Sequence, residues 1–293
     1  MRCPRCFRKL APGAACPADG ARAADEVATR VEVGAPPAVP GWRIGGLIAA
    51  GGQAAVWRAV REGQHEDEDD AAVRDRAVRD TAVRALKVAH GPAPELAHRF
   101  AEEAAALAAI GAPAVAATFD RGVLADRRPY LAMELVEGDT LGELLARAPA
   151  PPPIDDVVAW AAGLADGLAA IHAAGYVHRD LKPDNVVRQP DGAIRILDLG
   201  LAQRIVDGEL APIGQVVGTP LYLAPEQLRG EEVDPRADLY ALGAILFEAL
   251  TLRPPFAGDR AAIELGHLAL RAPRVASLRP VPARLDELVA ACL

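Results

Sequence analysis

Two oxygen-bearing side chains, those of Asn185 and Asp198, are placed where a short hairpin would bring them together. The turn pair Asp191-Gly192 separates the apolar strands Val186-Val187 and Ile194 to Leu197, which predicts a β-hairpin. Counting outward from the turn pair puts Asn185 opposite Asp198 at the open end. An amide oxygen beside a carboxylate suits Mg²⁺, which prefers a few protein oxygens together with phosphates. Either residue alone would be an ordinary polar loop residue.

A third carboxylate, that of Asp180, lies on the loop that leads into this hairpin. The chain upstream carries apolar residues at helical spacing, namely Val157, Trp160, Leu164, Leu168 and Ile171. They predict a helix that ends at Gly175, because glycine is a good helix terminator. Asp180 follows in the stretch YVHRDLKPDN. Its carboxylate could there accept the proton of a hydroxyl group that attacks a phosphate.

A lysine and a glutamate are both expected among apolar residues. Lys87 lies in the strand-like segment Val83 to Ala89, where a lone lysine would extend to solvent. A helix predicted from about Pro94 has an apolar stripe that includes Glu103, together with Leu96, Phe100, Leu107 and Ile110. A buried carboxylate needs a cationic partner, and Lys87 is the nearest upstream candidate. The alternative is that Glu103 lies at the edge of the stripe and meets only water.

One aspartate occupies a similar position farther along the chain. Asp238 shares a helical stripe with Leu242, Ile245 and Ala249, in a helix that Asp234-Pro235 is expected to start. An aspartate on an apolar face predicts that its carboxylate accepts backbone N–H groups and fixes a neighbouring loop.

Three of the four cysteines fall in the first sixteen residues, as Cys3-Pro4-Arg5-Cys6 and Cys16. This clustering favours a metal over a disulfide in a reducing compartment, and tetrahedral zinc would need a fourth ligand. Asp19 stands where a fourth cysteine would be, but Asp19-Gly20 is equally an ordinary turn signal. Residues 1–34 are therefore either a zinc ribbon or a loosely held tail.

The composition bounds the remaining possibilities. The chain has 293 residues, of which 51% are hydrophobic, and a net charge of -8. The acidic balance argues against a nucleic-acid partner, and no apolar run is long enough for a membrane helix. No secretory signal follows the basic N-terminus, so a cytoplasmic location is expected. Anchoring of a longer protein through a region beyond residue 293 is left open.

Taken in order, several motifs resemble bacterial Ser/Thr protein kinases of the eukaryotic-like type. They are ALKV at 85–88, Glu103, HRDLKPDN at 178–185, Asp198-Leu199-Gly200, Gly218-Thr219-Pro220, Ala224-Pro225-Glu226 and Asp238. The resemblance implies an α+β, two-lobed protein kinase-like fold. A small β-rich N-lobe with one key helix would be followed by a larger, mainly α-helical C-lobe whose C-terminal end is missing.

The implied domains follow from the same alignment. Residues 1–34 would be a zinc-ribbon-like segment and residues 35–41 a Pro-rich linker. The kinase domain would span 42–293, with an N-lobe at 42–133, a hinge at 134–137 and a C-lobe at 138–293. An acidic stretch at 62–80 is expected to be a solvated insertion between two strands.

The resemblance also implies a role for each matching residue. Asp180 would orient the acceptor hydroxyl, Lys182 would neutralise the transferring phosphate, and Asn185 and Asp198 would bind Mg²⁺. The implied ATP-binding residues are Ile48, Gly51, Gly52, Val56, Lys87, Glu103, the gatekeeper Met133, the hinge residues Glu134 and Val136, and Asp198. Cofactors would be ATP and Mg²⁺, with Zn²⁺ if the cysteines form a ribbon, and the partners would be protein substrates with Ser or Thr.

The glycine-rich loop departs from the family pattern. In the stretch IAAGGQAAVW, Ala49 and Ala54 stand where the family has glycine. If the backbone there had to be left-handed, each alanine would cost roughly 1–2 kcal/mol and loosen ATP binding. This departure leaves open a pseudokinase or nucleotide-binding scaffold.

Two further departures lie in the C-lobe. Residues 201–217 contain no Ser, Thr or Tyr, so the activation loop is expected to be ordered without phosphate. Asp207 or Glu209 would stand near Arg179, or remain solvated. The chain ends before the arginine that the family pairs with Glu226, so that carboxylate is expected to lack its partner.

Overall fold

The computed structural model describes residues 2–3, 6–11, 13–17, 20–21, 35–62, 83–205 and 220–293. The chain divides into two compact units. Unit 1 comprises Met1–Ala28 and Glu137–Leu293, and unit 2 comprises Thr29–Val136. The N-terminal cysteine segment thus belongs to the same unit as the C-terminal part of the chain.

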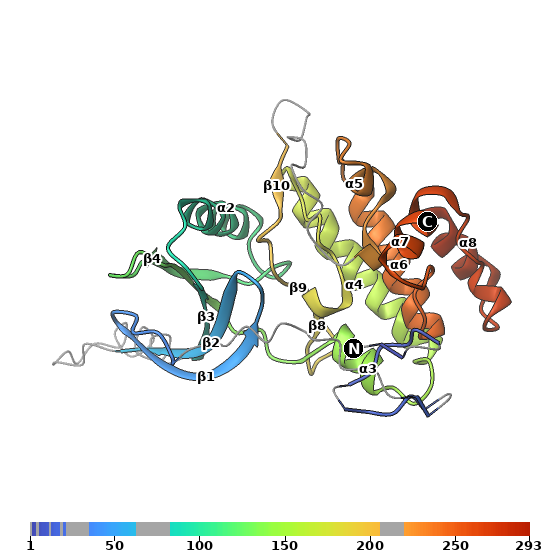
Figure 1. Cartoon of the computed structure of the whole chain (residues 1–293), viewed down its shortest axis with the longest axis horizontal. Coiled ribbons are helices and arrows are strands. Elements are labelled where there is room, and N and C mark those ends of the chain that lie inside the picture. Colours follow the sequence, from blue (N-terminus) through green and yellow to red (C-terminus); the bar gives the residue numbers. More distant parts are fainter. Residues whose placement is uncertain are drawn as a thin grey trace. The chain divides into compact units, whose positions relative to one another are not determined.

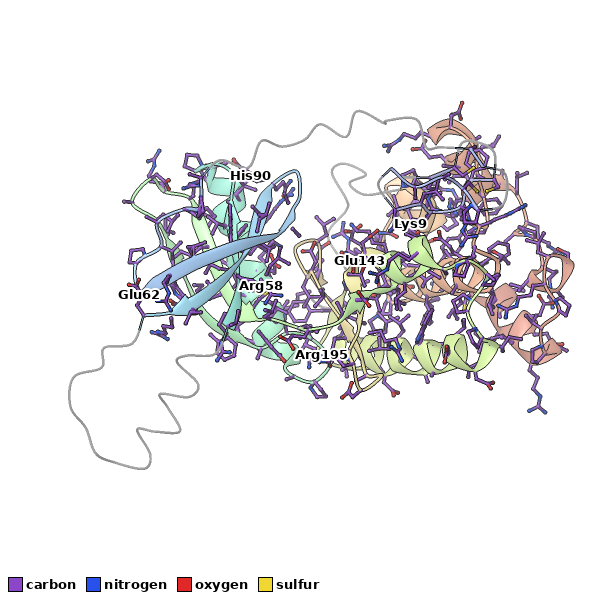
Figure 2. All side chains as sticks on the ribbon, turned by 90° about the horizontal axis from the view of Figure 1, so that it is seen from below. Lys9, Arg58, Glu62, His90, Glu143 and Arg195 are labelled. Atoms are coloured by element: carbon purple, nitrogen blue, oxygen red, sulfur yellow. The ribbon has the colours of Figure 1, made fainter. Side chains whose placement is uncertain are left out.

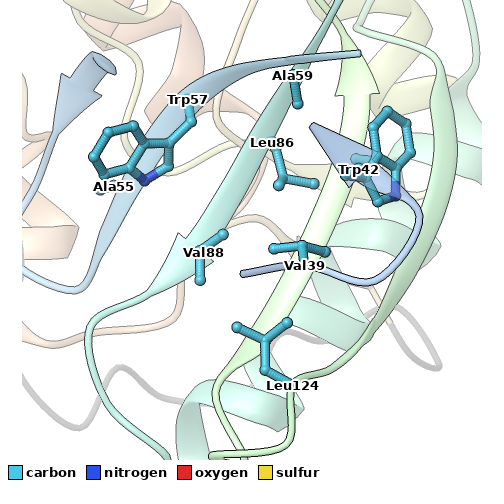
Figure 3. Close-up of a cluster of buried hydrophobic side chains, with 9 residues drawn as sticks. Val39, Trp42, Ala55, Trp57, Ala59, Leu86, Val88 and Leu124 are labelled. Carbon is cyan, nitrogen blue, oxygen red and sulfur yellow. The ribbon is translucent and has the colours of Figure 1, made fainter. Parts of the chain in front are cut away.

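Unit 2 is built on an antiparallel sheet of five strands in the order β1-β2-β3-β5-β4. The strands are β1 (Trp42–Ala50), β2 (Ala54–Arg61), β3 (Val83–Ala89), β4 (Thr118–Val123) and β5 (Pro129–Glu134). Alternate residues of β2 and β3 form a buried cluster that includes Trp57, Leu86 and Val88 (Figure 3). Side chains alternate between faces along a strand, so the intervening residues, Lys87 among them, point to the opposite face.

Helix α2 (Pro94–Ile110) belongs to the same unit and packs against β4 and β5. Its bounds agree with the helix predicted from the apolar stripe. Phe100, Glu103 and Leu107 are buried, as that stripe requires. The acidic insertion lies between β2 and β3, as expected from its position, and its residues 63–82 are outside the described part of the chain.

Unit 1 is mainly helical (Figure 1). Its α-helices are α3 (Leu141–Arg147), α4 (Ile154–Ala173), α5 (Pro225–Arg229), α6 (Arg236–Thr251), α7 (Arg260–Ala269) and α8 (Ala283–Cys292). Short 3-10 turns are η1 (Pro183–Asn185), η2 (Pro220–Tyr222) and η3 (Val275–Ser277). Its short strands are β6 (Asp139–Thr140), β7 (Tyr176–Val177), β8 (Val186–Arg188), β9 (Ile194–Ile196) and β10 (Gln203–Arg204).

Two helices form the core of unit 1. Helix α4 buries the whole predicted stripe, and the chain leaves it through Gly175, whose φ is 79°. Helix α6 is buried along most of its length, which explains why it is so apolar. No helix in the described part of the chain is long and apolar enough to span a membrane.

The hairpin after the loop of Asp180 differs from the predicted register by one residue. β8 and β9 pair Val186 with Ile196, and the Asn185 carbonyl accepts the Leu197 N–H at 2.7 Å. The loop contains three residues rather than two, because Gln189 N–H donates to the Ala193 carbonyl and Gly192 takes a φ of 91°. Asp198 is therefore not directly opposite Asn185, but one residue beyond its cross-strand partner.

The N-terminal segment, meaning the described residues between 2 and 21, is held by two tight turns around its cysteines. Phe7 N–H donates to the Cys3 carbonyl, and Gly20 N–H donates to the Cys16 carbonyl. Cys3, Leu10 and Cys16 form a small buried cluster of their own. The segment therefore has local structure despite its few apolar residues.

Candidate active site

Unit 2 holds the predicted ion pair. Lys87 Nζ lies 2.7 Å from Glu103 Oε1 and 2.8 Å from Oε2, and the glutamate is 3% exposed. Strand β3 directs the lysine onto the face of the sheet that α2 covers, and α2 presents Glu103 from its buried stripe. The prediction of this pair is confirmed, and the alternative of a glutamate at the edge of the stripe is wrong.

The residues around Lys87 line up across the sheet. Val56 is the β2 partner of Lys87, Ala49 is the β1 partner of Val56, and Leu131 is the β5 partner of Lys87. Cross-strand partners share a face, so Val56 and the lysine point to the same side. Ala85, two residues from Lys87, adds a small buried side chain to this face. Ala85 was not singled out in the sequence analysis, although its small size so close to Lys87 was visible in the sequence.

The loop between β1 and β2 contains Gly51, Gly52 and Gln53. Gly51 N–H donates to the Ala54 carbonyl at 2.9 Å, and the Gly51 carbonyl lies 2.8 Å from His90 Nε2. Ala49 and Ala54 lie within strands, and neither has a positive φ. The left-handed backbone that would have penalised the alanines is not present, so their substitution for glycine carries no backbone strain.

The remaining residues predicted for nucleotide binding lie on β1 and β5 and after β5. Ile48 is a half-exposed residue of β1, while Met133 and Glu134 end β5. Glu134 forms two hydrogen bonds with the backbone of Ala117. Its N–H donates to the Ala117 carbonyl, and its carboxylate accepts the Ala117 N–H. Val136 is the last residue of unit 2.

Unit 1 holds the loop with Asp180. Lys182 Nζ lies 2.5 Å from Asp180 Oδ2, and Asn185 Nδ2 donates to the Asp180 carbonyl at 2.9 Å and to Oδ2 at 3.3 Å. The 3-10 turn η1 brings Asn185 back toward the aspartate. A cation and an amide thus orient one carboxylate, which is the arrangement needed to receive a proton at a defined position.

Asp198 lies just after the β8–β9 hairpin. Its φ is 59°, its Oδ1 accepts the Gly200 N–H at 3.3 Å, and its side chain is exposed. The next residue, Leu199, is 1% exposed and anchors the turn in the core. This turn exposes the Asp198 carboxylate to solvent, while the buried Leu199 fixes the backbone.

Asp238 fixes the backbone that carries Asp180. Its Oδ2 accepts the His178 N–H and its Oδ1 accepts the Arg179 N–H, each at 2.9 Å. Oδ2 also lies 2.8 Å from His172 Nε2 at the end of α4. The predicted role of Asp238 is confirmed.

Three residues that support this loop were missed by the sequence analysis. His178 is fully buried, and its ring bridges the Leu197 carbonyl and the Asp180 N–H. Gln227 joins the Arg179 carbonyl to the Ala224 N–H. The position of His172 at the end of the predicted helix, close to the loop, was the available signal.

Arg179 also has a partner that was not predicted. Its Nη1 contacts Gln203 Oε1 on β10, and burial lowers its pKa. Asp207 and Glu209, the partners considered from the sequence, lie outside the described residues. Within the described parts of the chain, Glu226 takes part in no ion pair.

The cysteines of the N-terminal segment converge. The sulfur atoms of Cys3, Cys6 and Cys16 all lie within 4.8 Å of one another. The pKa of Cys6 is raised to about 11 by burial and by its cysteine neighbours. Asp19, the predicted fourth ligand, lies outside the described residues.

Comparison with known proteins accords with this geometry. The sequence profile of the protein kinase domain matches residues 71–287. The chain belongs to the protein kinase family. The matched residues of this kinase domain include Lys87, Glu103, Asp180, Asn185 and Asp198, while the β1–β2 loop lies outside the match.

Relatives of this kinase domain include proteins of Mycobacterium tuberculosis and Streptomyces coelicolor. The serine/threonine-protein kinase PknL of Mycobacterium tuberculosis is 43% identical over 195 residues, which is 66% of this chain and 48% of that protein. A probable serine/threonine-protein kinase of Streptomyces coelicolor is 36% identical over 223 residues, 74% of this chain and 31% of that protein. The M. tuberculosis serine/threonine-protein kinase PknA is 34% identical over 224 residues, 75% of this chain and 49% of that protein. The chain therefore spans about half, or less, of the length of these relatives.

Proposed function

We propose that this chain transfers the γ-phosphate of ATP to Ser or Thr hydroxyls of protein substrates. The observation that carries the proposal is the hydrogen-bonded loop in which Lys182 and Asn185 orient the Asp180 carboxylate. Asp180 would align the acceptor hydroxyl and receive its proton. Lys182, already beside that carboxylate, would then place its positive charge near the transferring phosphate.

The choice of Ser and Thr over Tyr rests on Lys182 in the HRDLKPDN stretch and on the names of the relatives. Each of the relatives compared above is named a serine/threonine-protein kinase. Because Ser and Thr side chains are short, their hydroxyl reaches Asp180 only when the substrate backbone lies close to the Asp180 loop. Lys182 can there neutralise the phosphate that is transferred.

ATP would be held in part by residues of unit 2. Lys87 would pair with the phosphates while Glu103 fixes its orientation. Gly51 and Gly52 would offer backbone N–H groups, and Val56 an apolar contact to the base. The backbone of Glu134 and Val136, after the gatekeeper Met133, would meet the adenine edge.

The donor set of Asn185 and Asp198 fits Mg²⁺, since both offer oxygen atoms. Asn185 directs its amide nitrogen to Asp180, which turns its amide oxygen the other way. When bound, the ion would neutralise charge on the phosphates. These two residues would hold it in place.

The cysteine cluster would bind Zn²⁺ through Cys3, Cys6 and Cys16. Zinc–sulfur bonds of about 2.3 Å in tetrahedral geometry separate the sulfurs by roughly 3.8 Å. Cys6 Sγ and Cys16 Sγ are 3.5 Å apart, which is close to that spacing. Asp19 is the proposed fourth ligand. Replacement by Co²⁺ should give thiolate-to-metal absorption that Cys6→Ser weakens; a colourless cobalt-treated protein would count against the site.

The test of the kinase proposal uses the whole chain with Mg-ATP and a basic protein acceptor. Phosphoamino-acid analysis should find label on Ser and Thr and none on Tyr. The scaffold alternative arose from the altered glycine-rich loop, whose alanines show ordinary strand backbone. ATP binding without any transfer to several acceptors would favour that alternative over the proposal.

A further inference from the structure

Within unit 1, a buried ion pair binds the N-terminal segment to helix α6. Arg2 Nη1 lies 2.7 Å from Glu248 Oε1, and Arg2 Nη2 lies 3.1 Å from Oε2. Arg2 Nη2 also donates to Tyr222 Oη at 2.8 Å, and that hydroxyl donates to Glu248 Oε2 at 2.5 Å. Glu248 is 1% exposed, so a carboxylate in the core of α6 takes its countercharge from the second residue of the chain.

The buried charges of Arg2 and Glu248 shift the pKa values of the groups around them. Burial alone would lower the pKa of Arg2, yet Tyr222 and Glu248 raise it above its ordinary value. Burial, with the nearby glutamate, raises the pKa of Tyr222, so its hydroxyl remains a hydrogen-bond donor. A buried carboxylate of this kind favours a positively charged side chain as its binding partner, because an uncharged side chain would leave the carboxylate without a countercharge.

A second basic side chain binds farther along the segment. Lys9 Nζ lies 2.6 Å from both Asp184 oxygens, next to helix α3 (Figure 2). Asp184 is about half exposed, so this pair is accessible to solvent and weaker than the Arg2 pair. Gly142 of α3 leaves the space for it, since a Cβ at that position would lie 2.6 Å from Lys9 Nζ.

Asp184 adjoins the loop that carries Asp180, and Glu248 is linked to that loop through Tyr222. Asp184 is in the same 3-10 turn as Asn185, whose amide is bonded to Asp180. Tyr222, on the other side, lies two residues before Ala224, which Gln227 links to the Arg179 carbonyl. The N-terminal segment thus binds one acidic residue next to the Asp180 loop and a second one that is linked to this loop through Tyr222 and Gln227.

We propose that the N-terminal segment covers the surface where a basic protein acceptor binds, with Arg2 and Lys9 occupying the positions of acceptor side chains. This rests on the proposed kinase function. An extended acceptor advances about 3.3 Å per residue, so the residues beside its hydroxyl must pass over the neighbourhood of Asp180. Acceptors rich in Arg or Lys then compete with the chain's own N-terminus for Asp184 and Glu248.

Release would begin at Lys9, because its pair is exposed while the Arg2 pair is buried. Two substitutions should weaken that end without touching the core. Lys9→Glu reverses the charge facing Asp184. Lys9→Ala removes the positive charge that faces Asp184 and leaves Asp184 itself unchanged.

The test measures fluorescence anisotropy of a labelled peptide of alternating Arg and Ala, which cannot be phosphorylated. Lys9→Glu and Lys9→Ala should each bind it about two- to fivefold more tightly than the wild type, the range that an exposed ion pair supplies. The matched control is Arg260→Glu, which makes the same charge change at an exposed pair on α7 with Glu264. It should bind like the wild type.

Equal affinity of the wild type and both Lys9-end variants would overturn the proposal, as would equal tightening by Arg260→Glu. Thermal melting confirms that each variant is folded. Phosphate transfer is measured separately, where the KM for a basic acceptor should fall in Lys9→Glu while kcat is unchanged. Tighter peptide binding with no transfer would reject the kinase function but keep the covered basic-peptide surface; transfer with unchanged binding would do the reverse.

Discussion

Lys87 and Glu103 meet through two short contacts, 2.7 Å and 2.8 Å, although they come from different elements of unit 2 and one of them is 3% exposed. A carboxylate this deeply buried has little access to water. The pair is therefore expected to serve the fold as well as the proposed chemistry, and these two contributions can be separated by measurement.

Lys87→Met should cost about 2–4 kcal/mol of unfolding free energy, because it leaves Glu103 charged and buried without its cation. Glu103→Gln should cost less, since Lys87 is partly exposed and can reach water. The double variant should cost less than the sum of the two. Urea unfolding of all four proteins gives the coupling energy, and strictly additive costs would mean that the pair is not energetically coupled.

Asp238→Asn should destabilise the chain by about 2–4 kcal/mol, because each carboxylate oxygen accepts one N–H, from His178 or Arg179, and an amide would place an NH2 donor against one of them. It should also lower phosphate transfer, since those N–H groups fix the loop of Asp180. Asp234→Asn is the control: its exposed carboxylate serves mainly Arg236, and a change below about 1 kcal/mol is expected. A mild effect of Asp238→Asn, similar to that of the control, would refute the anchoring role.

Gly52→Ala should leave stability unchanged to within about 0.5 kcal/mol or raise it slightly, because its φ is ordinary and a Cβ there meets nothing within 4 Å. Gly175→Ala should cost about 1–2 kcal/mol, since its φ of 79° suits only glycine. Both are read by thermal unfolding. Weaker ATP binding by a fully stable Gly52→Ala would show that phosphates approach this backbone closely.

Stability should fall between pH 7 and pH 5 through His267 of α7. Burial lowers the pKa of His267 to about 4, so between pH 4 and the unfolded pKa of about 6.5 only the unfolded chain binds this proton. The contribution is complete above pH 6.5 and is lost as pH falls toward 4, about 2 kcal/mol of it by pH 5.

The variant His267→Asn isolates this effect, because an amide oxygen can replace Nδ1, which lies 2.6 Å from the Tyr240 hydroxyl. Urea unfolding at pH 7 and pH 5 should show a smaller loss in the variant than in the wild type. Identical losses would show that His267 does not titrate in this way.

Sequence patterns predicted the elements that depend on local periodicity. The stripes of α2 and α4 follow from helical spacing alone, and so do the inward positions of Glu103 and Asp238. The hairpin register failed by one residue, because Gly192 extends the turn to three residues and sequence spacing does not distinguish the two lengths.

Long-range contacts were beyond the sequence patterns. Arg2 and Glu248 are separated by nearly the whole chain, and neither residue type nor spacing indicates that one neutralises the other. The support of the Asp180 loop by Gln227 is of the same kind, since only tertiary packing brings Gln227 to Arg179. The ordinary backbone of Ala49 and Ala54 likewise required coordinates.

The most direct test of the central claim is phosphate transfer from Mg-ATP to a basic protein acceptor by the wild type and by Asp180→Asn. Asp166→Asn, an exposed aspartate on α4, serves as the matched control. The proposal predicts label on Ser and Thr with the wild type and the control, and a loss of at least about a hundredfold in Asp180→Asn. Equal transfer by Asp180→Asn, or none by a folded, ATP-binding wild type, would contradict it.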